Sequence, residues 1–162
     1  MRAMLRLLHL IGLAAFLGSI LVHILLGEVV DPAHDLAGYA LAMKIKYLAT
    51  LILTLPGLAL MILTGTVMAW RQRLTLLTAK WLGAKLVLVI LIALNGAAVL
   101  TPLGAETARL AAEGVLSGAL PATFTEVKQK EDIAGALNLL MIVAVSTLAL
   151  VRPGTRIAVG RA

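Results

Sequence analysis

Two histidines, one lysine and one asparagine lie inside the first and third long apolar segments of this sequence, where polar side chains are rare. His9 and His23 belong to the first such segment, and Lys85 and Asn95 belong to the third. An imidazole can ligate a metal ion or move protons, and a lysine ammonium can do acid–base work or pair with an acidic group. Ionisable side chains are costly in such surroundings, so these residues are the first candidates for function.

Four apolar segments must position these side chains, at residues 5–27, 47–70, 82–101 and 133–151. The chain of 162 residues is 61% hydrophobic and only 14% charged, which is unlike a soluble domain. Each segment is about long enough to cross a hydrocarbon core of about 30 Å. A soluble bundle is excluded because its helices would keep a polar face. The sequence therefore predicts one all-α membrane domain over residues 1–162, a four-helix bundle whose transmembrane helices span about 5–27, 43–70, 78–101 and 132–151.

The distribution of charge predicts the orientation of these helices. Short loops that stay in the cytoplasm are rich in Lys and Arg. One side of the predicted bundle carries eight basic residues, whereas all eight acidic residues fall in the two opposite loops, together with five basic ones. Both termini are therefore expected in the cytoplasm, and the chain in a bacterial inner membrane. The net charge of +6 follows from this topology and favours contact with the lipid bilayer, and no basic patch with interleaved aromatic residues suggests nucleic acid.

The outer side of the predicted bundle has three further features. Lys44 and Lys46 are expected to extend toward the outer interface at the start of the second helix. Residues 104–120 are Ala-rich and mildly amphipathic, which predicts a short helix at the outer surface between the third and fourth helices. Residues 121–130 are expected to be irregular.

Pro56 lies in the interior of the second predicted helix and should kink it there.

His9 and His23 are separated by 14 residues, which places both on one helix face about 21 Å apart along its axis. This spacing resembles the paired haem ligands of cytochrome b helices. Their depths pair His9 with Lys85 in the cytoplasmic half and His23 with Asn95 in the outer half. The first helix also carries small residues at four-residue spacing, which suits close helix packing and permits a homodimer or a partner subunit.

The chain as a whole resembles a superfamily of small four-helix bacterial membrane proteins. The resemblance rests on Leu8-His9, on Pro56 with Leu63-Thr64-Gly65, on Trp81, Lys85 and Leu86, and on Asn138-Leu139-Leu140 with Val151-Arg152-Pro153. This superfamily includes the CopD-type copper-resistance proteins and the HemJ-type protoporphyrinogen oxidases. The resemblance to the HemJ-type enzymes implies b-type haem, with His9 and Lys85 as the functional polar pair. Asn95 stands where the HemJ-type pattern has a second histidine.

Three classes of function remain open at this point. The first is a haem-binding or porphyrin-oxidising redox protein, with His9 and Lys85 as catalytic and cofactor-binding residues and His23 and Asn95 as further ligands. The second is a copper-handling protein that uses His23, His34 and Met43, because imidazole and thioether groups suit copper. The third is an accessory subunit without chemistry of its own. The absence of cysteine excludes thiolate metal sites, disulfides and thioether-linked haem.

Overall fold

The computed structural model describes residues 2–71 and 80–151, and within them the regular structure is entirely helical. The elements in chain order are α1 (Arg2–Val29), α2 (Leu36–Ala49), the π-helix η1 (Thr50–Thr54), α3 (Leu55–Arg71), α4 (Lys80–Leu94), the π-helix η2 (Asn95–Leu100), α5 (Thr101–Ser117) and α6 (Ala122–Val151). Because α2, η1 and α3 join without a break, as do α4, η2 and α5, the chain forms four long helical rods in the described part.

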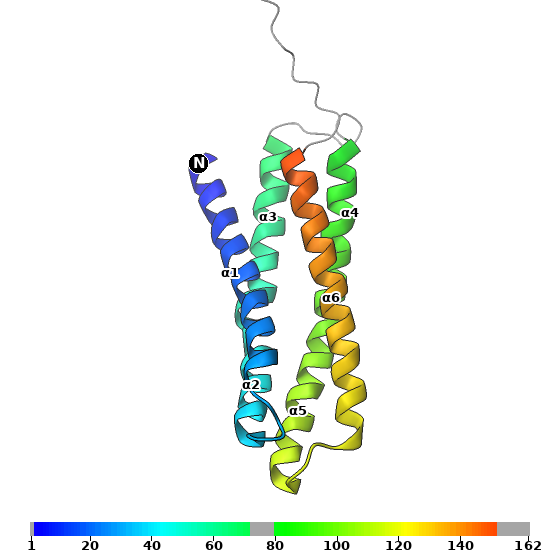
Figure 1. The fold of residues 1–162 in the computed structure, drawn as a ribbon. Helices are drawn as coiled ribbons and strands as arrows, with labels where there is room; N and C mark the ends of the chain where they lie inside the picture. Colours follow the sequence, from blue (N-terminus) through cyan, green and yellow to red (C-terminus); the bar gives the residue numbers. More distant parts are fainter. Residues whose placement is uncertain (1, 72–79, 152–162) are drawn as a thin grey trace, which may run out of the picture.

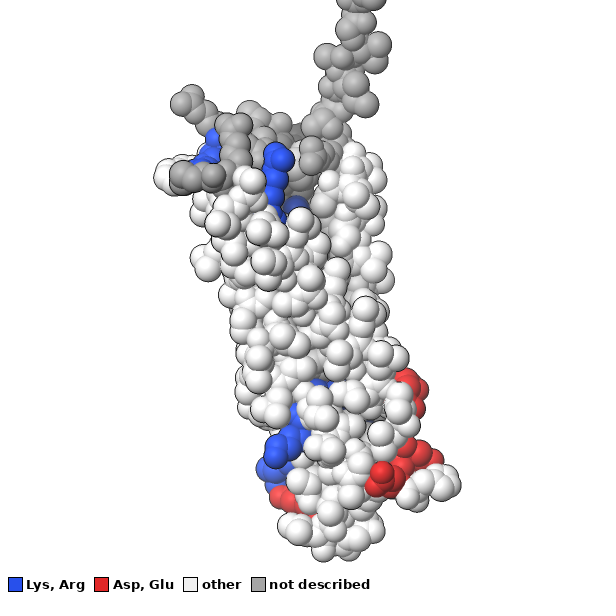
Figure 2. Space-filling model, turned by 90° about the vertical axis from the view of Figure 1, so that its left-hand side faces the viewer, with Lys and Arg blue, Asp and Glu red and all other residues white. Residues whose placement is uncertain are grey.

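Each rod is long and apolar enough to cross a membrane. The candidate spans are Ala3–Val29, Leu36–Arg71, Trp81–Ser117 and Ala122–Val151. The rods stand side by side, with the start of α1 and the end of α6 at the same end of the bundle (Figure 1). One face has a broad middle band without Lys, Arg, Asp or Glu, and the charged side chains lie toward its two ends (Figure 2). The predicted all-α architecture with four long apolar helices is confirmed.

At the end of the bundle that contains the α1–α2 and α5–α6 loops, the helices extend further than the sequence predicts. The last helix begins at Ala122 rather than near residue 132, so residues 122–130 are helical where irregular structure is expected. The charges there lie along the helix surface in pairs four residues apart, such as Lys130 with Glu126 at 2.6 Å and Lys128 with Asp132. Such pairs stabilise a helix. The charged residues in this segment therefore pair with one another on the surface of a helix and do not indicate a loop.

The segment at residues 104–120 also differs from the expected separate surface helix. Most of it belongs to α5, which continues from η2 and packs against α2. Leu110 and Ala111 of α5 are buried in one cluster with Tyr39, Met43 and Phe124. The helix ends only at Gly118, whose φ of 78° suits a residue without a side chain. Its apolar face is therefore covered by the rest of the bundle.

Both interior prolines follow directly after a π-helix. Pro56 is the second residue of α3 after η1, and Pro102 is the second residue of α5 after η2. Proline lacks the N–H that an α-helix uses at this position, so the wider turn accommodates it without ending the rod. The hydroxyls of Thr54 and Thr101 donate to backbone carbonyls five residues earlier, at 3.4 and 2.8 Å. The predicted perturbation at Pro56 therefore takes the form of a π-helix within a continuous rod.

The helices α1 and α3 approach closely at a pair of glycines. A Cβ added at Gly12 would lie 2.9 Å from the carbonyl oxygen of Gly57, and one added at Gly57 would lie 2.9 Å from both the Gly12 oxygen and the Phe16 nitrogen. The neighbours are backbone atoms, which cannot move aside without shifting a helix. Gly18, which the sequence places in a small-residue row for packing, has open space around it within the chain.

Gly57→Ala is expected to lower the free energy of unfolding by about 1–3 kcal/mol, because the added methyl group forces α1 away from α3. Gly18→Ala is the matched control and should cause no loss, since nothing lies within 4 Å of its added Cβ. Thermal unfolding of both variants in detergent micelles measures the difference. Equal midpoints would show that the glycine contact does not set the helix spacing.

Candidate functional site

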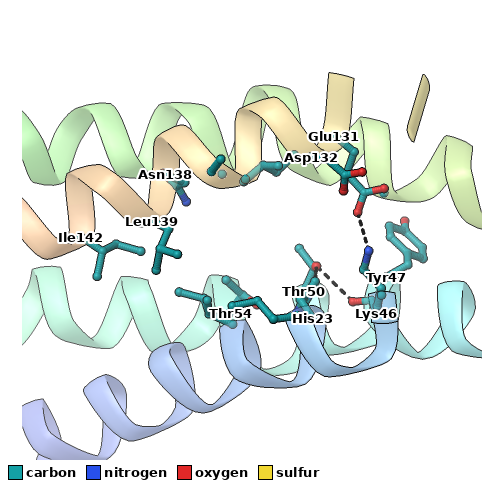
Figure 3. Close-up of a pocket in the computed structure, with 18 of the residues that line it drawn as sticks. His23, Lys46, Tyr47, Thr50, Thr54, Glu131, Asp132, Asn138, Leu139 and Ile142 are labelled. Atoms are coloured by element: carbon teal, nitrogen blue, oxygen red, sulfur yellow. Dashed lines mark hydrogen bonds and ion pairs between the residues drawn. The ribbon is translucent and has the colours of Figure 1, made fainter. Parts of the chain in front are cut away.

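A cavity of about 610 Å³ lies between α1 and α6, with both π-helices contributing to its wall. Its polar lining includes His23, Lys46, Thr50, Glu131 and Asn138, which converge from different helices (Figure 3). Its volume falls in the range of sites that take small organic ligands.

The strongest electrostatic feature of the cavity is a buried ion pair between Lys46 of α2 and Glu131 of α6. Lys46 Nζ lies 3.0 Å from Glu131 Oε1, and the two side chains are only 8% and 10% exposed. The second carboxylate oxygen accepts a hydrogen bond of 2.9 Å from the buried hydroxyl of Thr107 on α5. The expectation that Lys46 extends toward the outer interface is wrong, because Glu131 offers it a partner inside the bundle.

The ion pair stabilises the fold only as a pair. Removing two charges from water costs several kcal/mol for each ion, and their attraction offsets this cost when the remaining hydrogen-bonding groups are satisfied. Glu131 meets that condition through Lys46 and Thr107. The Lys46 ammonium has three donor hydrogens and, among the residues that the structure describes, one partner, Glu131.

His23 lies beside the ion pair, and both of its ring nitrogens are engaged. Nδ1 lies 2.5 Å from the Ser19 carbonyl oxygen, which can only accept, so Nδ1 carries a hydrogen. Nε2 lies 2.8 Å from the hydroxyl oxygen of Thr50, which is also 3.1 Å from the carbonyl oxygen of Lys46. If the single hydroxyl hydrogen points to Nε2, the ring is neutral; if it points to the carbonyl, Nε2 donates and the ring is charged. Rotation of one hydroxyl thus accommodates either protonation state.

Asn138 supplies the unsatisfied polar atom of the cavity wall. Its residue is 7% exposed, and its Oδ1 is buried without a hydrogen-bond partner in the described structure. The amide nitrogen points toward the cavity (Figure 3). Because the two ends of an amide are assigned from their surroundings, the group can present either a donor or an acceptor to the cavity. A buried polar atom without a partner carries a desolvation penalty that a ligand would relieve.

Four glycines create the empty volume of the cavity. A Cβ added at any of them would meet no atom within 4 Å, although all four line the cavity: Gly27, Gly96, Gly104 and Gly135. Glycine inside a helix is less stable than alanine by about 1 kcal/mol in water. None of these four brings two backbones together, so their effect here is to leave space.

His9 lies outside the cavity lining and has a different environment. Its Nδ1 is 2.9 Å from the hydroxyl oxygen of Thr64, which donates its hydrogen to the Leu60 carbonyl at 2.6 Å. With the hydroxyl hydrogen on that carbonyl, Nδ1 donates to Thr64, and the neutral ring then has its lone pair on Nε2. The ring also lies against Gly65, where an added Cβ would be 3.4 Å from His9 Cε1. The positive charge of Lys85 acts on this ring, so the structure brings the two residues into one region.

Asn95 stands apart from His23 in its contacts. Its amide nitrogen donates to the Ala134 carbonyl oxygen at 2.9 Å, which ties η2 to α6. It lines a shallower depression with Pro102 and Leu137 and is absent from the lining of the His23 cavity.

The three residues considered for copper have separate surroundings. His34 is exposed in the α1–α2 loop, where its Nδ1 lies 2.7 Å from Asp31 Oδ2, and Met43 is 1% exposed in the apolar cluster around Tyr39. The Ala33 N–H and the His34 ring hold the pKa of the Asp31 carboxyl below its usual value. Within residues 2–71 and 80–151, no three His, Asp or Glu side chains gather as a metal site would require.

Comparison with known families decides the broad identity of the chain. The model of the predicted integral membrane protein family DUF2269 matches residues 3–153. The chain belongs to the DUF2269 family. It is therefore a multi-pass integral membrane protein, consistent with the four apolar rods. No curated protein and no solved structure matches it.

Sequence reasoning missed the ion pair of this DUF2269 protein. Lys46 and Glu131 stand near the ends of apolar segments, where charge normally indicates water. One signal was present: Glu131 precedes Asn138 by two helical turns, so both lie on the same face of one helix. A carboxylate on the same helix face as an intramembrane amide predicts a row of polar side chains along that face. This row lines the cavity.

Lys46→Met is expected to lower the free energy of unfolding by about 3–5 kcal/mol, because it leaves the Glu131 charge buried without its partner. The double variant Lys46→Met, Glu131→Leu should recover most of this loss, since no charge remains. Lys44→Met, at an exposed position on the same helix, is the control and should resemble the wild type. Chemical unfolding in micelles measures all three. A double variant less stable than Lys46→Met would contradict the pairing.

Proposed function

We propose that this DUF2269 protein is a redox protein of the bacterial inner membrane that binds b-type haem, or a related porphyrin, through His9. The observation that carries the proposal is the state of the His9 ring. Its Nδ1–H is held by Thr64, so its Nε2 lone pair is available to iron. A hydrogen bond from the second ring nitrogen is the usual companion of a metal-ligating histidine.

The surroundings of His9 favour the same ligand. The imidazole lies beside Gly65 of α3, where an added Cβ would be in van der Waals contact with the ring. Lys85 adds a positive charge to the region, and a haem carries propionate groups that an ammonium attracts. His23 is a poorer iron ligand, because its Nε2 already has Thr50 as a partner.

The bound haem would supply one-electron transfer, and the residues of the chain would hold and tune it. Thr64 fixes the tautomer and direction of the His9 ring, and the apolar side chains around it keep water away. The resemblance to HemJ-type proteins extends the proposal to porphyrin as a substrate, with Lys85 as the acid–base group.

We also propose that both termini lie in the cytoplasm, so that the cavity with Lys46 and Glu131 belongs to the outer half of the membrane. Support comes from the sequence, in which eight basic residues precede the first span, separate the second from the third and follow the fourth, against the acidic residues of the other two loops.

Single cysteines test this orientation, because the chain has none of its own. Ala33→Cys, in the exposed α1–α2 loop, should react with a membrane-impermeant maleimide in intact spheroplasts. Thr75→Cys, between the second and third spans, should react only after lysis. The reverse labelling pattern would place the termini outside.

The haem proposal predicts a Soret band in protein purified from haem-supplemented cells, and its loss in His9→Ala. Thr64→Val should weaken haem binding about 10- to 100-fold, because the ring loses the partner that orients it. His34→Ala is the control and should keep the band, since His34 is exposed in a loop. Absorption spectra with haem titration give the result. Colourless wild-type protein after haem supply would refute the proposal.

A further inference from the structure

The cavity between α1 and α6 has the features of a ligand site that the haem proposal leaves unused. Four helical glycines line the cavity and leave its volume empty. A Cβ added at any of them would meet no atom within 4 Å, so close packing does not require glycine there. A void lined by apolar groups alone would be a packing defect. This one also has a buried amide oxygen without a partner in the described structure, Asn138 Oδ1, and the paired ammonium of Lys46, and they indicate what the ligand must offer.

Two hydrogen-bonding groups face the cavity from different depths. At one depth, the Lys46 ammonium has donor hydrogens beyond the one used by Glu131 in the described structure. Asn138 lies two turns along α6 from Glu131, a rise of about 10 Å, and presents a nine-tenths buried amide whose oxygen has no partner in the described structure. The ligand should therefore carry a polar atom toward each end of an apolar body.

The charged residues that line the cavity favour a neutral ligand over an acid: Lys46 pairs with Glu131, Lys128 pairs with Asp132, and Glu28 adds a further carboxylate. Glu131 already neutralises Lys46, and breaking the pair to bind an acid would leave a buried carboxylate without its counter-ion. A neutral carbonyl oxygen can accept one of the remaining ammonium hydrogens while the pair stays intact. The amide of Asn138 suits both a carbonyl and a hydroxyl, because either of its ends can face the cavity.

The remaining walls determine the shape of the entrance and the innermost part. Phe16, Leu58 and Ile142 form an apolar cluster at the inner wall. Ile24 of α1 and Leu139 of α6 line the cavity and are 48% and 41% exposed on the apolar flank of the bundle. An apolar tail of a ligand would extend along this flank, whereas the exposed carboxylates of Glu28 and Asp132 line the cavity at its charged end.

From these features we propose that the cavity binds a membrane quinone, with one ring oxygen at Lys46 and the other at Asn138. The proposal concerns binding and is independent of haem at His9, because the two sites share no residue. A quinone has the required neutral charge, flat apolar ring and oxygen at each end.

The test measures binding of decylubiquinone to purified protein in micelles by isothermal titration calorimetry. Gly135→Leu should abolish binding, because its side chain fills the cavity, while its unfolding midpoint stays near that of the wild type. Gly18→Leu is the matched control: it adds the same side chain at an open position outside the cavity lining and should bind normally. Wild-type affinity in Gly135→Leu would overturn the proposal.

A second variant tests the polar recognition. Asn138→Leu should weaken decylubiquinone binding about 2- to 10-fold, the effect of losing one neutral hydrogen bond. If this variant binds as the wild type does and palmitate displaces decylubiquinone, the cavity takes acyl chains and the quinone proposal fails. Repeating the titration with His9→Ala separates the two proposals, because quinone binding should persist there whether or not haem binds the wild type.

Discussion

The contact between Lys46 and Glu131 is the constraint on which the arrangement of the half of the bundle near the α1–α2 loop depends. Two opposite charges inside an apolar bundle are tolerated only while they remain together. The pair therefore fixes the depth of α2 against α6, and Thr107 adds α5 to the same junction. The first two rods and the last two rods meet at this point. The cavity lies beside the junction, so its width is set by a contact that cannot lengthen without a large electrostatic cost.

The sequence predicts the membrane-crossing helices well, because long apolar stretches leave few alternatives. It predicts their outer ends poorly. Charged residues were interpreted as loops, yet Lys130 with Glu126 and Lys128 with Asp132 pair along the surface of α6 and extend it. The same rule placed Lys46 at the interface, where it would have been solvated. A single sequence shows that a charge is present, whereas only the fold shows whether its partner is water or another side chain.

The candidate site was predictable in part for a related reason. Depth along a helix follows from residue number, and this is how the sequence paired His9 with Lys85. Rotation of one helix about its axis relative to another does not follow from residue number. Thr64 was therefore not foreseen as the partner of His9, and Asn95 bonds the Ala134 carbonyl instead of approaching His23. The cavity was not predicted either, because a sequence does not distinguish a glycine that leaves space from a glycine that lets two helices approach closely.

Ile24 and Leu139, which line the cavity and are exposed on the apolar flank, bear on how the cavity would discriminate among molecules that reach it through the lipid. A molecule that arrives through the lipid has already left water, so the hydrophobic free energy is gained on entering the bilayer and little is left for the site to add. Lipid tails are as apolar as the leucines and isoleucines of the wall. Affinity above that of the surrounding lipid must then come from shape and from the few polar groups inside. A ligand of this cavity would thus be selected from a solvent that is itself hydrophobic, and a single amide could outweigh the whole apolar lining in that choice.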